Sequence, residues 1–375
     1  MRFATVSTVV SLIATIWAVA APAAAAGPPP RPQAAAWVVF APGYGGVLAG
    51  ANLDAERPIA SLTKLMTARL AIRGQALGRT ATVSANAAGV GESGIGLVAG
   101  ERQRVRDLVE ALIVYSGNDA AVAIAEEVAG SEAAFVGQMN AEAARMGLRH
   151  TAYRTPHGLD AAGAYSSARD VLALSIASMR DPFFRSLARA TSGSIPAHSF
   201  PARNTLLARY AGLDGIKTGH TSGAGWCLAA SGQRDGVRLY VVVLGAPDEA
   251  RRDADISRLM DWGFSRFQEV RLVRRGQGAG SLAVPWSDAR IQVVAGRGLA
   301  RILRPGQRLR DEVELPTHAP LPLRRGQRVG TLTVRAGDRV LGRVPLVAAE
   351  SAGEPGLADR AGWVVGRALD IAWGR

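Results

Sequence analysis

Apolar positions recur along this chain of 375 residues with two different periods. A spacing of three or four residues predicts amphipathic helices, here near 61–70, 105–114, 119–128, 131–147, 168–179 and 253–267. Short apolar runs rich in β-branched and aromatic residues predict strands, here 37–40, 47–51, 215–221, 226–231 and 237–244. Strands that flank a helical middle favour an α/β (α+β) domain with an antiparallel sheet and a helical cluster.

The pattern changes after residue 267. Residues 272–350 form short alternating runs separated by Gly and Pro, which predicts a small all-β domain containing a hairpin of residues 331–335 and 339–347. The last segment, 357–375, has one apolar helical face, with charged residues opposite and Trp363 and Trp373 near the boundary. This amphipathic helix is too polar to span a bilayer, so it either lies in the membrane interface or docks on its own domain.

The N-terminus has the pattern of a secretory signal. Arg2 is followed by an apolar run at 9–21 and by the small residues 24–26, so we expect cleavage after Ala26. A retained membrane anchor is the alternative, but the apolar run is short and is followed by Ala and Pro. Cys227 has no cysteine partner and cannot form an intramolecular disulfide. The expected divisions are a signal peptide (1–26), a first domain (27–267), a β domain (268–352) and a terminal helix (353–375).

Charge is unevenly distributed over these divisions. The whole chain has a net charge of +13, and residues 268–375 carry 18 Arg against 10 Asp and Glu. A basic C-terminal third favours anionic partners. Because the expected signal peptide argues against nucleic acid, a membrane surface or a cell-wall polymer is the better expectation.

Lysine is rare in this chain and occurs only as Lys64 and Lys217, against 42 Arg. Where a generic positive charge suffices, the chain uses Arg. Arg cannot lose its proton in a protein, whereas a buried Lys can be neutral and act as a base. Each lysine also lies in a short motif, Ser61-Leu62-Thr63-Lys64 or Lys217-Thr218-Gly219. The two lysines are therefore the first candidates for proton transfer.

Each motif considered by itself has an ordinary structural explanation. Ser61 and Lys64 lie one helical turn apart and could be a surface pair. The segment from Tyr115 to Asn118 could be a helix–helix turn with a capping side chain. Lys217 could simply begin a strand. The three motifs in this order, with both lysines in them, are much more specific and indicate a penicillin-interacting serine enzyme.

The chain resembles the D-alanyl-D-alanine carboxypeptidases, the low-molecular-mass penicillin-binding proteins of serine peptidase family S11. The resemblance is carried by residues 59–67, 115–120, 156–160, 165–170 and 214–225, in the family order. It implies a β-lactamase/transpeptidase-like catalytic domain, a small all-β domain and a C-terminal amphipathic helix. It also implies an exported enzyme, in the periplasm or peripherally held on the outer face of the cytoplasmic membrane.

The resemblance assigns roles to individual residues. Ser61 is the expected nucleophile, Lys64 its general base and Ser116 a proton relay. The expected oxyanion donors are the backbone N–H groups of Ser61 and His220. The expected substrate contacts are Asn118, Lys217, Thr218, Gly219, His220, Arg203 and Arg252, with Arg251 as the alternative to Arg252.

The implied reaction removes the terminal D-alanine from a peptidoglycan stem pentapeptide, and β-lactams would acylate Ser61. No cofactor is expected, and no metal, because the remaining histidines lack metal-ligand spacing: His150, His157, His198 and His318. A class A β-lactamase is less favoured because no Glu-x-x-Leu-Asn run lies between the second and third motifs. A murein endopeptidase or transpeptidase stays open, as does a catalytically silent cell-wall-binding scaffold.

Overall fold

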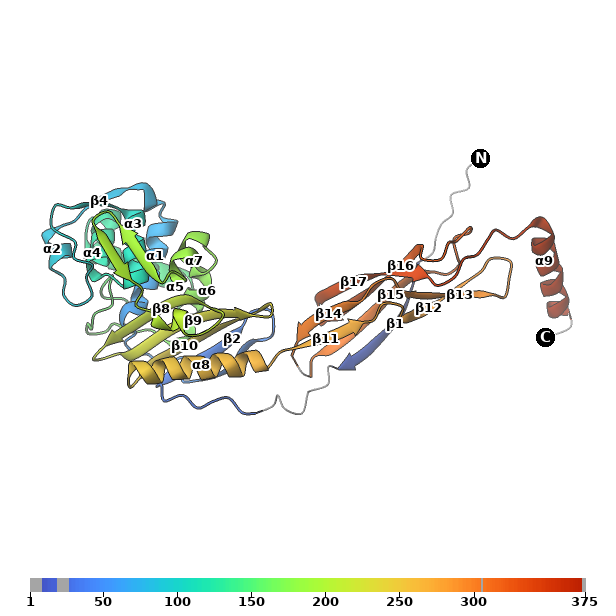
Figure 1. Ribbon diagram of the computed structural model, residues 1–375, viewed down its shortest axis with the longest axis horizontal. Helices are drawn as coiled ribbons and strands as arrows, with labels where there is room; N and C mark the ends of the chain where they lie inside the picture. The colour runs from blue at the N-terminus through green and yellow to red at the C-terminus, as the bar shows by residue number, and fades with distance from the viewer. Residues whose placement is uncertain (1–8, 19–26, 305, 373–375) are drawn as a thin grey trace. The chain divides into compact units, whose positions relative to one another are not determined.

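The computed structural model describes residues 9–18, 27–304 and 306–372. The chain forms two compact units (Figure 1). Gly27–Ser265 is the α/β unit, and Arg266–Arg375 with the N-terminal segment is the β unit. Each unit has its own hydrophobic core of buried side chains.

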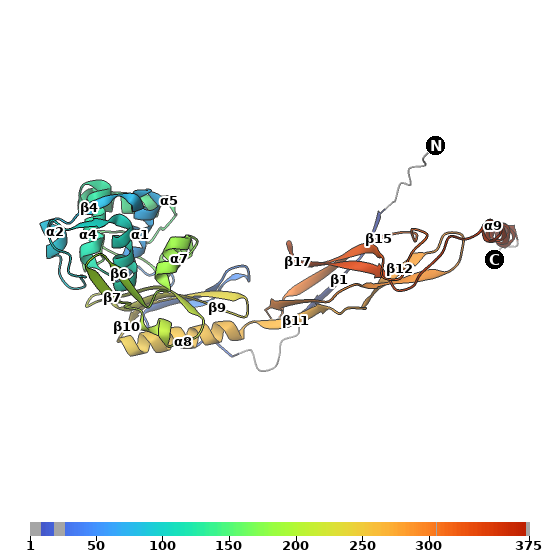
Figure 2. The same ribbon diagram turned by 45° about the horizontal axis from the view of Figure 1, so that its top comes forward.

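The α/β unit is built on one antiparallel sheet with the strand order β3-β2-β10-β9-β8. The strands span Gly46–Ala51 (β3), Ala36–Ala41 (β2), Val237–Ala246 (β10), Gly225–Arg234 (β9) and Leu213–Thr221 (β8). Val241, Val242 and Val243 are all buried because helices cover both faces of the sheet. Helix α8 (Glu249–Ser265) covers one face and the helical cluster covers the other (Figure 2).

The helical cluster lies between the second and third strands in sequence. Its helices are η1 (Ala60–Thr63), α1 (Lys64–Arg73), η2 (Ala76–Gly78), α2 (Ala85–Gly89), α3 (Val105–Glu110), η3 (Ala111–Tyr115), α4 (Asn118–Ala129), α5 (Glu132–Arg145), α6 (Ala168–Ser178), α7 (Pro182–Ala188) and η4 (Thr205–Ala208). Short two-stranded ribbons join them: β4 (Thr80–Thr82) with β5 (Arg102–Arg104), and β6 (Ser192–Ile195) with β7 (His198–Pro201). Leu62, Leu65 and Met66 are fully buried and fix the start of α1 in the core.

Two helix boundaries differ from the sequence expectation. The single helix expected over 105–114 continues only to Glu110, as α3. A π-helical turn, η3, follows it. The backbone N–H groups of Ser116 and Gly117 both reach the carbonyl of Ala111, which widens the last turn. Helix α8 begins at Glu249 rather than at 253, because Asp248 caps it by accepting from the backbone N–H of Arg251 (2.7 Å).

The β unit is an antiparallel sheet with the order β1-β15-β16-β17-β13-β12, and β11 pairs with β14 beside it. These strands span Val9–Ala18 (β1), Gln268–Val273 (β11), Gly278–Ala283 (β12), Arg290–Ala295 (β13), Leu299–Leu303 (β14), Arg308–Pro316 (β15), Arg328–Ala336 (β16) and Arg339–Ala348 (β17). The hairpin expected over 331–347 is β16–β17. Of the expected signal peptide, Arg2 and residues 24–26 lie outside the described residues, whereas part of its apolar run forms β1.

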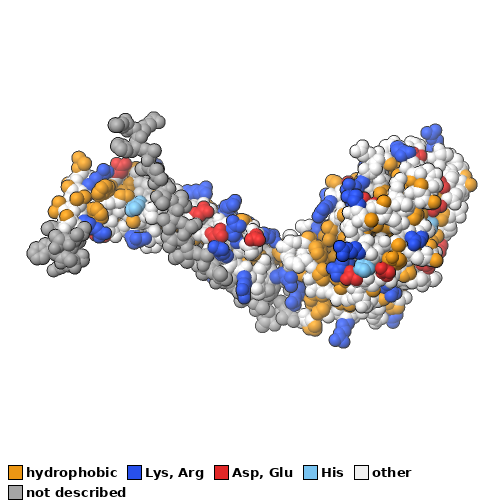
Figure 3. All heavy atoms as spheres, turned by 180° about the vertical axis from the view of Figure 1, so that it is seen from behind, with side chains coloured by type: hydrophobic (Ala, Val, Ile, Leu, Met, Phe, Trp, Pro, Cys, Tyr) orange, Lys and Arg blue, Asp and Glu red, His pale blue; other side chains and the backbone are white. Residues whose placement is uncertain are grey.

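Helix α9 (Leu357–Ala372) ends the described chain. Leu357, Val364 and Val365 are 85%, 49% and 58% exposed. Trp363 contacts Trp286 edge-on with ring centroids 5.8 Å apart. Figure 3 shows exposed hydrophobic side chains at the end of the β unit that carries this helix. Among the described residues, no helix combines the length and the apolar character needed to cross a lipid bilayer.

Candidate active site

The side-chain amine of Lys64 lies at the centre of a compact polar group. Its Nζ is 2.8 Å from Ser61 Oγ, 2.7 Å from Asn118 Oδ1 and 2.7 Å from the backbone carbonyl of His157. Lys64 is fully buried, whereas Ser61 is half-buried and reaches the surface of the site. The first two motifs of the sequence therefore meet at one amine.

The local fold places Ser61 beside this amine. Ser61 lies in the 3₁₀ turn η1, and Lys64 is the first residue of α1, so the two side chains project from the same face. Ala60, directly before Ser61, has a positive φ of 48° and is almost fully buried. A non-glycine residue in this region is strained, and such strain is concentrated at functional sites.

Asn118 is held on both sides by the loop that follows α2. Its backbone N–H donates to the carbonyl of Ser93 (2.6 Å), and its Nδ2 donates to the carbonyl of Gly91 (2.9 Å). Its Oδ1 is thereby oriented toward Lys64. Ser116, two residues earlier, is buried and has a positive φ of 80°, which turns the chain from η3 into α4.

The third motif lies on β8, at the edge of the sheet. Lys217 is buried, and its Nζ donates to the carbonyl of Thr218 (3.0 Å). A Cβ at Gly219 would lie 3.0 Å from the backbone nitrogen of Ser61 and 3.0 Å from the carbonyl oxygen of Ile59. Strand β8 therefore passes directly beside the Ser61 N–H, and any side chain larger than that of glycine would crowd this approach.

Burial changes the protonation of both lysines. It lowers the pKa of Lys64 well below its usual value, and the charge of Lys217 lowers it further. Burial is also the main reason that the pKa of Lys217 is lowered to about 7, with Arg203 and Arg252 adding to the effect. Both effects favour the neutral form of the Lys64 amine.

A neutral amine fits the three neighbours of Lys64. It has two N–H donors and one lone pair. The carbonyl oxygens of Asn118 and His157 can only accept hydrogen bonds, so they take the two N–H groups. The lone pair then faces Ser61, whose hydroxyl donates to it. This arrangement presents a base to one hydroxyl, as nucleophilic catalysis requires.

The expected arginines reach the site in different ways. Arg203 is exposed, and its guanidinium lies 4.2 Å from the centre of the Tyr115 ring, next to Ser116. Arg252 is buried, bonded to Glu249 and Asp253 and 5.5 Å from the Trp226 ring. Arg251 is exposed and paired with Asp248 instead.

Sequence reasoning missed the part that His157 plays in this group. It noted residues 156–160 only as a matching segment, but the carbonyl of His157 binds Lys64. The imidazole Nδ1 accepts from the N–H of Leu159 (3.1 Å) and so closes the turn that aims this carbonyl. Burial lowers the pKa of His157 to about 4, which keeps Nδ1 unprotonated. By contrast, the exposed ring of His220 stacks on Trp226, with centroids 4.2 Å apart.

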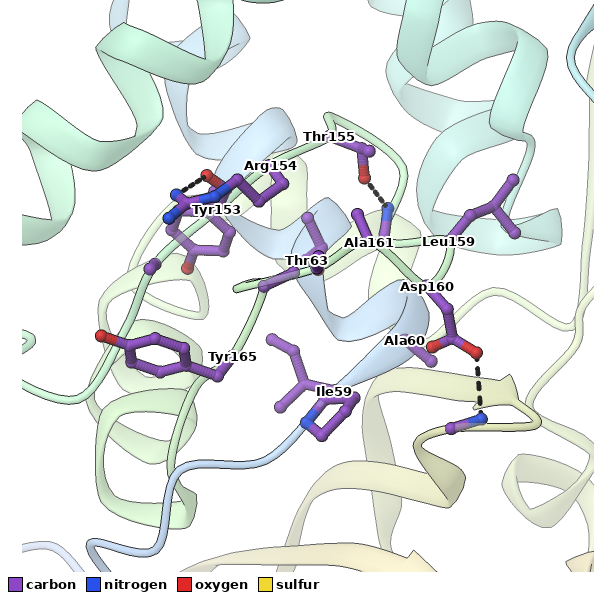
Figure 4. Close-up of a pocket in the computed structure, with 16 residues that line it drawn as sticks. Ile59, Ala60, Thr63, Tyr153, Arg154, Thr155, Leu159, Asp160, Ala161 and Tyr165 are labelled. Atoms are coloured by element: carbon purple, nitrogen blue, oxygen red, sulfur yellow. Dashed lines mark hydrogen bonds between the residues drawn. The ribbon is translucent and has the colours of Figure 1, made fainter.

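A pocket of about 350 Å³ lies beside the Ser61 turn (Figure 4). Ile59, Ala60 and Thr63 form one wall, and the loop of residues 152–165 forms the other. Asp160 ties this loop to the turn between β8 and β9: it accepts from Thr221 Oγ1 (2.7 Å) and from the N–H of Gly223 (2.9 Å).

Comparison with known proteins places the chain in one family. A family model described as D-alanyl-D-alanine carboxypeptidase (peptidase S11) matches residues 23–248. The chain is 34% identical to the D-alanyl-D-alanine carboxypeptidase DacC of Escherichia coli, over 88% of this chain and 87% of that protein. It is 35% identical to DacD of Salmonella typhimurium, over 88% and 90%.

Solved structures agree as well. Penicillin-binding protein 5 of Haemophilus influenzae is similar with a TM-score of 0.64 and 30% identity, covering 88% of this chain and all of that one. The Streptomyces K15 DD-transpeptidase gives a TM-score of 0.60 and 27% identity, covering 64% of this chain and all of that one. The chain therefore belongs to the D-alanyl-D-alanine carboxypeptidase family of serine peptidases.

Proposed function

We propose that this enzyme removes the terminal D-alanine from peptidoglycan stem pentapeptides through an acyl-enzyme on Ser61. The observation that carries the proposal is the contact of the buried Lys64 amine with the hydroxyl of Ser61 at 2.8 Å. Two carbonyl oxygens occupy the N–H donors of that amine, which directs its lone pair to the nucleophile. Family membership supports the choice of substrate.

In the acylation step, Ser61 Oγ attacks the carbonyl carbon between the last two D-alanines. The Ser61 proton moves to Lys64 Nζ as the new C–O bond forms. The backbone N–H groups of Ser61 and His220 donate to the oxyanion of the tetrahedral intermediate, which is stabilised without reorganisation. The close approach of Gly219 to the Ser61 nitrogen supports this pairing of donors across η1 and β8.

Collapse of the intermediate breaks the C–N bond and releases D-alanine. Its amine needs one proton, which Lys64 supplies through the Ser116 hydroxyl, with Lys217 on the same relay. The pKa of Lys217, about 7, suits a group that gives and regains a proton near neutrality. Water then hydrolyses the Ser61 ester and restores the free hydroxyl and the neutral amine.

The terminal carboxylate of the substrate would be held at the start of β8. Thr218 offers a hydroxyl, and Lys217 and the exposed Arg203 offer positive charge. Arg252 is already bonded to two carboxylates, so we propose that it acts as a buried cation behind Trp226 rather than as a direct contact. Asn118 would hold both Lys64 and the substrate amide.

β-Lactams would imitate the terminal dipeptide and leave a slowly hydrolysed ester on Ser61. Transpeptidation is the second candidate, because the Streptomyces K15 DD-transpeptidase has a similar fold. Incubation with a pentapeptide, with and without an acceptor amine, separates these two reactions, because both release D-alanine but only transpeptidation joins the acyl group to the acceptor. Cross-linked muropeptides are incubated in parallel to detect endopeptidase activity. We expect free D-alanine from the pentapeptide and none with Ser61→Ala. Cleavage of cross-links without D-alanine release would instead indicate an endopeptidase.

We also propose that the protein is exported, loses residues 1–26 and lies peripherally on the outer face of the cytoplasmic membrane through α9. Three observations support the last point. The apolar side chains Leu357, Val364 and Val365 are exposed. Trp363, which contacts Trp286, is of a residue type that is enriched at membrane interfaces. The β unit is also strongly basic, which favours anionic headgroups.

A further inference from the structure

The pocket beside the Ser61 turn lies on the path of the substrate. If the terminal carboxylate binds at Lys217 and Thr218 and the scissile carbonyl lies against Ser61 and His220, the peptide runs antiparallel to β8. This is strand addition at a sheet edge. The residue before the two D-alanines then lies opposite Thr221, about 3.3 Å further along the strand.

The next feature beyond Thr221 is the rim of the pocket. Gly223, in the β8–β9 turn, and Asp160, in the facing loop, both line it. Because both carboxylate oxygens of Asp160 are hydrogen-bonded to this turn, the rim is fixed and Asp160 offers little to a ligand. The part of the stem peptide that precedes the two D-alanines would therefore leave β8 beside this pocket.

The walls of the pocket suit an aliphatic chain. Half of its sixteen lining residues have aliphatic side chains: Pro58, Ile59, Ala60, Ala152, Leu159, Ala161, Ala162 and Ala164. These side chains carry no charge, and those of the alanines are only methyl groups, which leaves space between the walls. An unbranched side chain of several methylene groups would bury its length there and gain hydrophobic free energy.

A positive charge lies on the same pocket. Arg154 is exposed, and its NH1 donates to the carbonyl of Tyr153 (3.0 Å), as Figure 4 shows. Within the described residues, no carboxylate forms an ion pair with Arg154, whereas Arg169 is paired with Asp54. Gly163 lies against its NH2, where a Cβ would be 3.3 Å away. Its remaining N–H groups can receive a carboxylate in two-point contact.

We propose that this pocket receives the side chain of the stem-peptide residue before the two D-alanines, and that Arg154 selects a side chain ending in a carboxylate. The inference rests on the proposed function and specifies its substrate. The enzyme should accordingly prefer a diamino dicarboxylic acid at that position over a diamino monocarboxylic acid such as lysine.

Two pentapeptides that differ only at the third residue, diaminopimelic acid or lysine, test this inference. Release of D-alanine would be measured for the wild type, Arg154→Gln and Arg149→Gln. Arg149 is an equally exposed arginine outside the pocket, so its variant is the matched control for net charge. We expect the wild type and Arg149→Gln to favour the diaminopimelate peptide about tenfold in kcat/KM, which is the size of one charge-assisted contact.

In Arg154→Gln this preference should fall to near unity, because kcat/KM should fall for the diaminopimelate peptide and stay unchanged for the lysine peptide. Acylation by benzylpenicillin, which lacks this residue, should be unchanged and shows that the Ser61 site is intact. Equal turnover of both peptides by the wild type, or an undiminished preference in Arg154→Gln, would overturn the inference while leaving the carboxypeptidase assignment standing. Absence of D-alanine release from either peptide would overturn both.

Discussion

Lys64 Nζ lies 2.8 Å from Ser61 Oγ, and the amine is buried where the pKa of a lysine is strongly lowered. In most proteins a lysine is a solvated cation that cannot accept a proton. Here burial favours the neutral amine, and two carbonyl oxygens orient its N–H groups. The proposed acylation of Ser61 rests on this contact.

Lys64→Arg should abolish acylation although it keeps a basic residue. A guanidinium stays charged in the interior and has no lone pair to accept the Ser61 proton. General-base catalysis contributes about 10²–10⁴-fold, so we expect a loss of at least that size in the rate of fluorescent penicillin labelling. Circular dichroism of the variant should show that the fold is kept. Labelling within a few-fold of the wild type would contradict a proton-accepting lysine.

Gly219→Ala should damage the oxyanion site. The added Cβ would lie 3.0 Å from both the Ser61 nitrogen and the Ile59 carbonyl oxygen, two backbone atoms that cannot turn aside. The resulting shift between β8 and η1 should reduce the acylation rate about 100-fold or more, the effect of losing one oxyanion donor. Gly78→Ala, which meets no atom within 4 Å, is the control and should acylate normally. Normal rates in both variants would show that the approach of β8 to Ser61 is unimportant.

His157 should make the protein sensitive to acid. Its pKa is lowered to about 4, chiefly by burial, whereas in the unfolded chain it is near 6.5. Because the folded value is the lower one, its stabilising contribution is complete above pH 6.5 and is lost as the pH falls toward 4.

The loss from His157 amounts to at most about 3 kcal/mol in the free energy of unfolding. His157→Gln, which cannot titrate, should lose less stability than the wild type between pH 6.5 and 4.5. Urea unfolding at both pH values measures the difference. The same loss in both proteins would mean that His157 titrates as it does in water.

Helix α9 should carry membrane binding without affecting turnover. Deleting residues 357–375 should release the protein from anionic phospholipid vesicles in a sedimentation assay, and penicillin acylation should be unchanged. The paired change Val364→Ser and Val365→Ser should weaken binding in the same direction, since both side chains are about half exposed on this helix. Val340→Ser, an exposed valine on β17, is the control. Persistent binding after the deletion would place the membrane contact elsewhere.

Much of the fold can be predicted from the sequence, because the buried apolar residues recur with regular helix or strand spacing. The valine-rich run at 237–244 and the spaced apolar residues of α1 and α4 predict their elements to within a few residues. The π-helical turn before Ser116 could not be predicted, since the apolar pattern of residues 105–114 fits one continuous helix and the N–H groups that reach the Ala111 carbonyl lie beyond it, at Ser116 and Gly117. Helix α7 is seven residues long, too short for its apolar period to be seen.

The candidate site could likewise be predicted only in part from the sequence. The motifs that contain Ser61, Lys64 and Asn118 predict which side chains meet at the Lys64 amine. They do not predict the His157 carbonyl, because a backbone acceptor leaves no mark on residue identity. The pairing of Arg252 with two carboxylates could have been predicted, because Glu249 and Asp253 lie three residues before and one residue after it on the same helix.

Mapping the penicillin adduct tests the central claim most directly. Benzylpenicillin would be added to the wild type, Ser61→Ala and Lys64→Arg, and peptide mass spectrometry would locate the bound acyl group. A single adduct on Ser61 in the wild type, with none in either variant, is the predicted result. An adduct on another residue, or acylation of Ser61 at an undiminished rate without Lys64, would contradict the account.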